Sequence, residues 1–296
     1  MITINPKELP VMKLQLMLQG AVAPRPVAFA STIDEHGRVN LSPFSFFNIF
    51  SANPPILIFS PARRGRDNTT KHTFENVKKV SECVINIVNY DMVQQTSLAS
   101  VEYPEGINEF VKAGFTELPS EMVKPPRVAE SPVQFECRVN QIIELGTEGG
   151  AGNLVICEVL RMHIDEKVIG ENGLIDPFKI DQVARLGGDW YTRASQGLFE
   201  VAKPNQKMGI GVDQIPSDIR LSSILSGNHL GQLGNVEVLP DETSVNEYKL
   251  TELAEIFIEL EDDATALEQA LHHRAVELLN AGNVHEAWLT LLAFNN

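Results

Sequence analysis

The most conspicuous group of side chains that could bind a ligand is a set of four cations within nine residues. These are Arg63, Arg64, Arg66 and Lys71, with the hydroxyls of Thr69, Thr70 and Thr73 among or just after them. Guanidinium, ammonium and hydroxyl donors beside the free N–H groups of a helix N-terminus are the groups that bind phosphate. The segment therefore indicates an anion site. A solvated basic loop is the alternative interpretation of this segment alone.

A second group precedes the cations. The apolar run at residues 40–48 is interrupted by polar residues and ends in Ser45-Phe46-Phe47-Asn48, which offers backbone amides, an Asn amide and an aromatic wall to a flat heteroaromatic ring. A ring next to a phosphate describes a mononucleotide. FMN fits better than a nucleoside triphosphate, because the sequence has neither a G-x-x-x-x-G-K loop nor an obvious carboxylate pair for magnesium.

The elements that must position these groups are mostly strands. Apolar or alternating runs predict strands at residues 27–33, 38–42, 56–60, 83–88, 133–144 and 154–164. The turn Asp34-Glu35-His36-Gly37 joins the first two into a hairpin. Few helices separate the strands, so the body is expected to be a mainly antiparallel barrel with flanking helices and not a doubly wound sheet.

An amphipathic opening turn or short helix is expected at residues 6–20, and three more helices are expected within this body. One follows the basic loop, with Thr69 or Thr70 as its N-cap and Phe74, Val77 and Val80 on its apolar face. The others are expected at residues 90–101 and 107–113. Farther along, two adjacent glycines between an arginine and a Trp-Tyr pair indicate backbone that passes close to another group. A glycine turn before an exposed aromatic is the alternative.

Charge and cysteine content exclude several classes of protein. The net charge of −15 argues against binding to nucleic acid or an anionic membrane. Cys83, Cys137 and Cys157 are odd in number and lie in strand-like runs, so we expect buried small residues and no metal site. Charged residues in the first twenty and the lack of a 20-residue apolar stretch predict a cytoplasmic protein.

The distribution of charge predicts two domains. Residues 204–296 hold 4 Lys and Arg against 15 Asp and Glu, whereas residues 1–203 hold 20 against 24. Helix-like patterns also dominate the last fifty residues. We therefore expect a barrel domain at 1–204 and an acidic, mainly helical extension at 205–296.

Several motifs together resemble the flavin reductase-like family, whose fold is a Greek-key FMN-binding split barrel. They are Pro24-Arg25-Pro26-Val27, Asn40-Leu41-Ser42-Pro43-Phe44-Ser45-Phe46-Phe47-Asn48, Pro54-Pro55, Phe59-Ser60, Lys71-His72-Thr73 and Arg185-Leu186-Gly187-Gly188 with Tyr191. The similarity covers roughly residues 15–200. The sequence departs from the family pattern at His72, where Asp is frequent. The resemblance implies nothing about the role of the extension.

The resemblance implies a homodimer that holds FMN near the subunit interface. Thr32, Ser45, Phe46 and Asn48 would line the ring and ribityl chain. Ser60, Arg66, Lys71 and Thr73 would hold the phosphate. Arg185, Gly188 and Tyr191 would close the far side, from either subunit.

The expected activity is hydride transfer from NAD(P)H to flavin, in which the cofactor carries the chemistry and no side chain is assigned a catalytic role. Three alternatives remain open at this point. The chain could reduce another small-molecule acceptor with FMN tightly bound, or it could be an FMN-binding electron carrier or sensor without nicotinamide turnover. It could also be a structural barrel with no ligand, which predicts a colourless purified protein.

Overall fold

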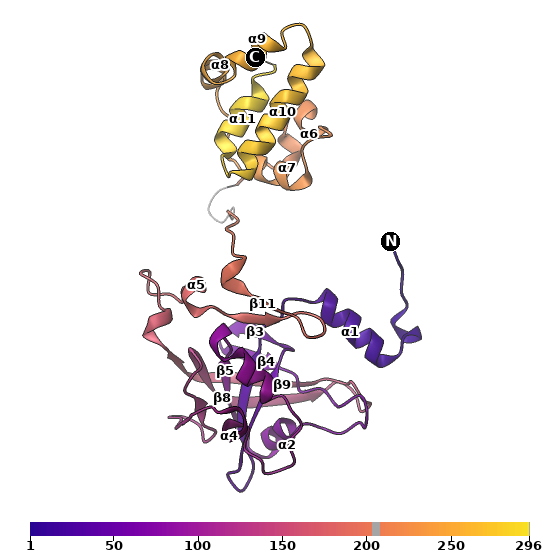
Figure 1. Ribbon diagram of the computed structural model, residues 1–296, viewed down its shortest axis with the longest axis vertical. Helices are drawn as coiled ribbons and strands as arrows, with labels where there is room; N and C mark the ends of the chain where they lie inside the picture. The colour runs from indigo at the N-terminus through magenta and orange to yellow at the C-terminus, as the bar shows by residue number, and fades with distance from the viewer. Residues whose placement is uncertain (203–207, 296) are drawn as a thin grey trace. The chain divides into compact units, whose positions relative to one another are not determined.

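The computed structural model describes residues 1–202 and 208–295, and the chain divides into two compact units, Met1–Phe199 and Glu200–Asn296 (Figure 1). The boundary predicted between residues 204 and 205 lies outside the described residues. Each unit has its own buried apolar clusters.

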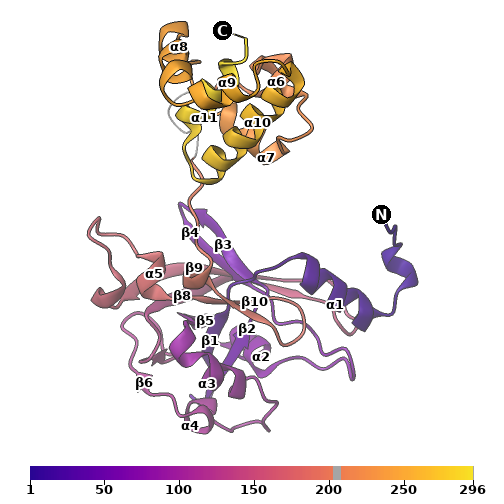
Figure 2. The ribbon, with the colours of Figure 1, turned by 45° about the horizontal axis from the view of Figure 1, so that its top comes forward.

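The first unit is built on one antiparallel sheet of seven strands in the order β2-β1-β5-β8-β9-β4-β3 (Figure 2). The strands are β1 (Ala28–Ile33), β2 (Val39–Phe44), β3 (Phe47–Ala52), β4 (Pro55–Phe59), β5 (Glu82–Ile87), β8 (Val133–Glu144) and β9 (Asn153–Ile164). All six predicted strands are present, and β1 pairs with β2 as the expected hairpin.

The two ends of this strand order lie close together in space. β2 and β3 are the outermost strands, yet only Ser45 and Phe46 separate them in the chain. Three Cα–Cα steps span at most about 11 Å, so the sheet must curve until its edges nearly meet. No ladder joins β2 to β3 among the described strands. The result is a barrel with an open seam, which confirms the predicted split barrel.

Both faces of the central strand β1 are covered, which explains why every residue of it is buried. Ala28 and Ala30 point into a cluster inside the barrel, with Phe59 and Ile85. Phe29 belongs to a second cluster on the other face. That cluster includes side chains from α4 (Glu109–Ala113) and from the segment around α3 (Val93–Leu98). Alternating residues of one strand therefore hold two layers together.

Two helix predictions need correction. The helix after the basic loop, α2 (His72–Lys79), begins later than expected, and its N-cap is Lys71, which makes no side-chain capping bond. Thr69 instead donates its hydroxyl to Asp67, and Thr70 donates to Glu75. The helix expected at residues 90–101 is a 3-10 turn at Tyr90–Met92 followed by the short α3, because the backbone of Met92 between them leaves the helical region (φ −110°, ψ 1°).

The three cysteines are buried, as predicted, and they also gather in the core. Cys83 and Cys137 are directly opposite on β5 and β8, and the Sγ atoms of Cys83 and Cys157 are 3.7 Å apart. Contact with Cys83 and burial raise the pKa of the Cys137 and Cys157 thiols. Their neutral form suits an apolar barrel interior.

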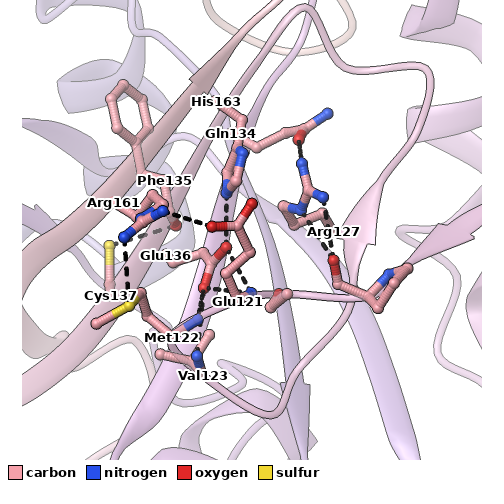
Figure 3. A network of polar contacts seen from close by, with 12 residues as sticks. Glu121, Met122, Val123, Arg127, Gln134, Phe135, Glu136, Cys137, Arg161 and His163 are labelled. Carbon is pink, nitrogen blue, oxygen red and sulfur yellow. Dashed lines mark hydrogen bonds and ion pairs between the residues drawn. The ribbon is translucent and has the colours of Figure 1, made fainter.

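A buried carboxylate fixes the loop that precedes β8 (Figure 3). Glu136 has no exposed surface, and its oxygens accept hydrogen bonds from the backbone N–H groups of Glu121, Met122 and Val123. Nε2 of His163 lies 2.6 Å from Oε1 of Glu136. Burial acts to raise the pKa of Glu136, but these hydrogen bonds and His163 outweigh it and hold the pKa below its usual range.

The second unit contains helices α6 (Ser217–Arg220), α7 (Gly227–Leu233), α8 (Glu242–Thr251), α9 (Ala254–Glu259), α10 (Ala264–Asn280) and α11 (Val284–Leu292). The predicted helices at the end of the chain are present, although the expected one at 248–260 is divided between α8 and α9. Trp288 is fully buried, and its indole N–H donates to the carbonyl of Leu233. Among the described helices of both units, none has the length and apolar character needed to cross a membrane.

Candidate functional site

A cavity of about 390 Å³ opens at the seam of the barrel. Segments distant in sequence form its wall, namely α1 (Val11–Ala21), the end of β2 with the link to β3, the residues after β4, and the loop that leads to α2. The lining side chains are Met12, Gln15, Gln19, Pro43, Phe44, Ser45, Phe46, Ser60, Ala62, Arg63, Arg64, Gly65, Arg66, Lys71 and Glu102. One part of the wall is apolar and aromatic, and another is cationic.

The basic loop is held in place by the turn between β8 and β9. The N–H of Arg63 donates to the carbonyl of Ala151, and the N–H of Gly150 donates to the carbonyl of Arg63. A Cβ at Gly149 would lie 3.1 Å from the carbonyl oxygen of Arg64, closer than most side chains come to backbone, so glycine suits this approach. The cations therefore sit on a rigid support provided by the longest hairpin of the sheet.

Two of the four cations organise the loop itself. The Arg63 guanidinium donates to both the side chain and the carbonyl of Asn68. Arg64 donates to the Thr69 hydroxyl, the Thr70 carbonyl and a carboxylate oxygen of Glu102. These donors are largely used within the protein. Arg66 also donates to Asp67 and Glu102, but its side chain is 68% exposed, so Arg66 and Lys71 are the cations most available to a ligand.

Lys71 is the least satisfied of the four. Its side chain is only 29% exposed, its ammonium makes no hydrogen bond to any described residue, and its nearest acid, Glu102, is 3.9 Å away. Burial is the largest cause that lowers the pKa of Lys71, followed by the charge of Arg64. A half-buried ammonium without a hydrogen-bond partner beside two guanidinium groups is suited to an anion.

The predicted residues brought together at this cavity are Ser45, Phe46, Ser60, Arg66 and Lys71. Oγ of Ser60 accepts from the N–H of Asn153, so the Ser60 hydroxyl proton remains available for donation. The backbone N–H groups of Ser45 and Phe46 have no acceptor among the described residues. The link across the seam thus offers free main-chain donors beside an aromatic side chain.

Three other predicted residues do not line the cavity. The Thr32 hydroxyl is buried and accepts from the Asn76 amide, and the Thr73 hydroxyl is buried and accepts from Asn40. Asn48 is exposed on β3, and its Oδ1 accepts from the N–H of Ile49. A direct role for these three in ligand binding stays a prediction.

Arg185, Gly188 and Tyr191 lie beside the end of α1. Arg185 on β10 (Val183–Arg185) exchanges two backbone hydrogen bonds with Arg25, and its guanidinium lies 5.3 Å from the ring of Tyr191 on β11 (Tyr191–Arg193). Gly188 has a φ of +58°, and the Arg185 guanidinium donates to its carbonyl. They lie outside the cavity wall, so their predicted role also stays a prediction.

Of the two adjacent glycines, Gly187 marks a close approach, as predicted, whereas a Cβ at Gly188 would have no neighbour within 4 Å. A Cβ on Gly187 would lie 3.3 Å from the Cα of Gly20, at the end of α1. The buried Arg25 donates from its guanidinium to the carbonyls of Gln19, Val22 and Leu186, so it ties α1 to this segment. The proline-flanked arginine therefore positions the helix that supplies Gln15 and Gln19 to the cavity.

Sequence reasoning missed α1 and Glu102 as parts of the wall. Glu102 is 31 residues after Lys71, and no local pattern connects the two. The sequence shows only that this helix carries the apolar residues Met12, Leu16, Met17 and Leu18, and the structure adds that no residue of α1 is buried. An apolar helix left uncovered is often part of a binding surface.

Comparison with known proteins, like the geometry of the cavity, supports a flavin-binding barrel. The model of the flavin reductase like domain matches residues 20–178. An uncharacterized protein of Halalkalibacterium halodurans is 34% identical over 203 residues, which cover 68% of this chain and 96% of that protein.

Two solved structures are similar to this protein over about two thirds of its chain. Nitrilotriacetate monooxygenase component B from Bacillus cereus is 30% identical with a TM-score of 0.64, covering 68% of this chain and 98% of that one. A provisionally assigned flavin reductase with a split barrel domain from Shewanella frigidimarina is 26% identical with a TM-score of 0.58, covering 67% and 96%. The chain therefore belongs to the flavin reductase-like family and has its split-barrel fold.

Proposed function

We propose that this protein is an FMN-binding oxidoreductase of the flavin reductase type, which uses NAD(P)H as the reductant and works as a homodimer. The observation that carries the proposal is the half-buried ammonium of Lys71, which has no hydrogen-bond partner among the described residues and shares a cavity with an aromatic wall. Family membership supports the flavin and the nicotinamide nucleotide as ligands.

The residues present fit FMN in both halves of the cavity. Lys71, Arg66 and the Ser60 hydroxyl provide donors for a phosphate. Phe46 and Pro43 provide apolar surface for a ring, and the free N–H groups of Ser45 and Phe46 can donate to polar edges. A volume of about 390 Å³ is within the range of sites for small molecules.

The bound flavin would supply the hydride-accepting centre. This chain's own residues have three tasks. The cations at the basic loop fix one end of the ligand, the aromatic residues at the seam orient the ring and exclude water from one side, and main-chain donors stabilise negative charge without an acid or base side chain. No side chain of this cavity is therefore assigned a catalytic role.

The homodimer is supported by apolar surface next to the site. β3 is an edge strand, and Ile49 and Phe50 on it are 64% and 63% exposed. Exposed edge strands with large apolar side chains are usually covered by a partner. A second copy would provide that cover and would place more residues around the open seam.

The test is an absorption spectrum of the purified protein after incubation with FMN and gel filtration, followed by NADH and NADPH oxidation with and without added flavin. We expect retained or saturable FMN binding and nicotinamide oxidation that requires flavin. Bound FMN without turnover of either nucleotide would refute the reductase proposal and favour an electron carrier or sensor. Absence of FMN binding would refute both.

A further inference from the structure

Glu102 places a carboxylate among the cations of the proposed phosphate site. Its Oε1 is 2.8 Å from Nε of Arg64 and 3.9 Å from Nζ of Lys71, and its Oε2 accepts from Arg66. Glu102 lines the same cavity as these three cations. The hydrogen bond from Arg64 is the first cause that holds the pKa of Glu102 below its usual range, so the carboxylate is charged at neutral pH.

Glu102 and a phosphate would draw on the same cations, because Glu102 already occupies donors of Arg64 and Arg66. A carboxylate between two guanidinium groups uses the same planar N–H donors that a phosphate would use. An incoming phosphate must therefore displace Glu102 or remain close to a second negative charge, and both weaken its binding. By contrast, a ligand with the same ring but without phosphate would not contact the donors that Glu102 occupies.

The segment that carries Glu102 is exposed and only locally bonded. Ser100, Val101 and Tyr103 make backbone hydrogen bonds to residues two or three positions earlier, and no strand of the sheet pairs with this segment. The Glu102 side chain is 35% exposed. Its carboxylate can therefore move away from the cations without breaking the barrel.

We propose that Glu102 is an internal competitor of the flavin phosphate, which occupies the cationic site when the flavin is absent and lowers the affinity for FMN. The proposal rests on the flavin function given above and extends it. An anion supplied by the chain offsets part of the positive charge of the three cations between binding events. It also speeds release, because the carboxylate takes the place of the departing phosphate. The flavin would then be an exchangeable ligand and not a permanently bound group.

The test compares Glu102→Gln with the wild type in titrations that follow the quenching of flavin fluorescence, with FMN and with riboflavin. We expect Glu102→Gln to bind FMN about five- to tenfold more tightly, because the competing charge is partly solvated and its effect is modest. Riboflavin affinity should stay within about twofold, since riboflavin has no phosphate. Glu105→Gln is the matched control, because Glu105 is in the same segment but pairs with Arg38 outside the cavity.

Unchanged or weaker FMN binding by Glu102→Gln would overturn the proposal, since Glu102 would then serve only to orient the arginines. A second measurement does not depend on flavin. Inorganic phosphate should raise the thermal midpoint of Glu102→Gln more than that of the wild type, and an equal rise in both proteins would also overturn the proposal. If neither protein bound FMN, the flavin function would fail while the phosphate measurement would still decide the role of Glu102.

Discussion

Replacement of Lys71 by Ala tests the assignment of the cationic half of the cavity. The change removes an ammonium that has no hydrogen bond to any described residue and lies 3.9 Å from Glu102. Lys71 is the N-cap residue of α2, but its side chain makes no capping hydrogen bond, so the change removes no capping interaction. A cation at a helix N-terminus is also unfavourable to the helix dipole. The unliganded variant should therefore unfold at the same temperature as the wild type.

The magnitude follows from the kind of bond that is lost. A hydrogen bond between charged groups contributes about 1.5–3 kcal/mol. The Lys71 side chain is 29% exposed, so solvent screens the interaction and the lower half of that range applies. We expect FMN binding to weaken by about 10- to 30-fold, which corresponds to about 1.5–2 kcal/mol.

The assay is the titration of flavin fluorescence with FMN and with riboflavin. Only FMN carries the phosphate, so the loss should be confined to FMN. Lys79→Ala is the matched control, because Lys79 is on the same helix but pairs with Glu35 at 3.0 Å and is outside the cavity. Equal losses for FMN and riboflavin, or no loss for FMN, would refute the placement of the phosphate at Lys71.

Three further predictions concern the framework of the site. Glu136→Gln should lower the free energy of unfolding at pH 7 by about 1–3 kcal/mol in urea titrations. The pKa of Glu136 is lower in the folded protein than in the unfolded chain. The extra stability of the wild type is therefore fully present above the unfolded pKa of about 4.3 and is lost as pH falls through the folded pKa. A difference in unfolding free energy that persists unchanged at pH 3 would contradict this account. A fragment of residues 1–199 should bind FMN as the full chain does, because every residue that lines the cavity is in the first unit. A large loss of affinity for FMN would show that the helical unit contributes to binding. Phe50→Asp should convert the proposed dimer into a monomer in light-scattering measurements. Ile258→Asp, at a similarly exposed position of the helical unit, should leave the dimer intact. A wild-type monomer would refute the dimer.

Local patterns were sufficient for most of the elements. The strands at 133–144 and 153–164 follow from the alternation of apolar and polar residues, which reflects a sheet with one buried face. Helix N-termini were less predictable. Thr69 and Thr70 have the right side chains to cap α2, but their hydroxyls donate hydrogen bonds to Asp67 and Glu75, and the helix begins after Lys71. Competition between alternative hydrogen-bond partners is decided by the folded loop and not by the type of residue.

For the site, the sequence by itself determined the composition, since Ser45, Phe46, Ser60, Arg66 and Lys71 are identifiable as groups for a ring and a phosphate. Only the tertiary structure decided which groups face one cavity. The seam of the barrel brings α1 and Glu102 to the cations, and it leaves the hydroxyls of Thr32 and Thr73 bonded to buried amides. The physical reason is that residue types set which bonds a side chain can make, whereas closure of the sheet sets which partners are within reach.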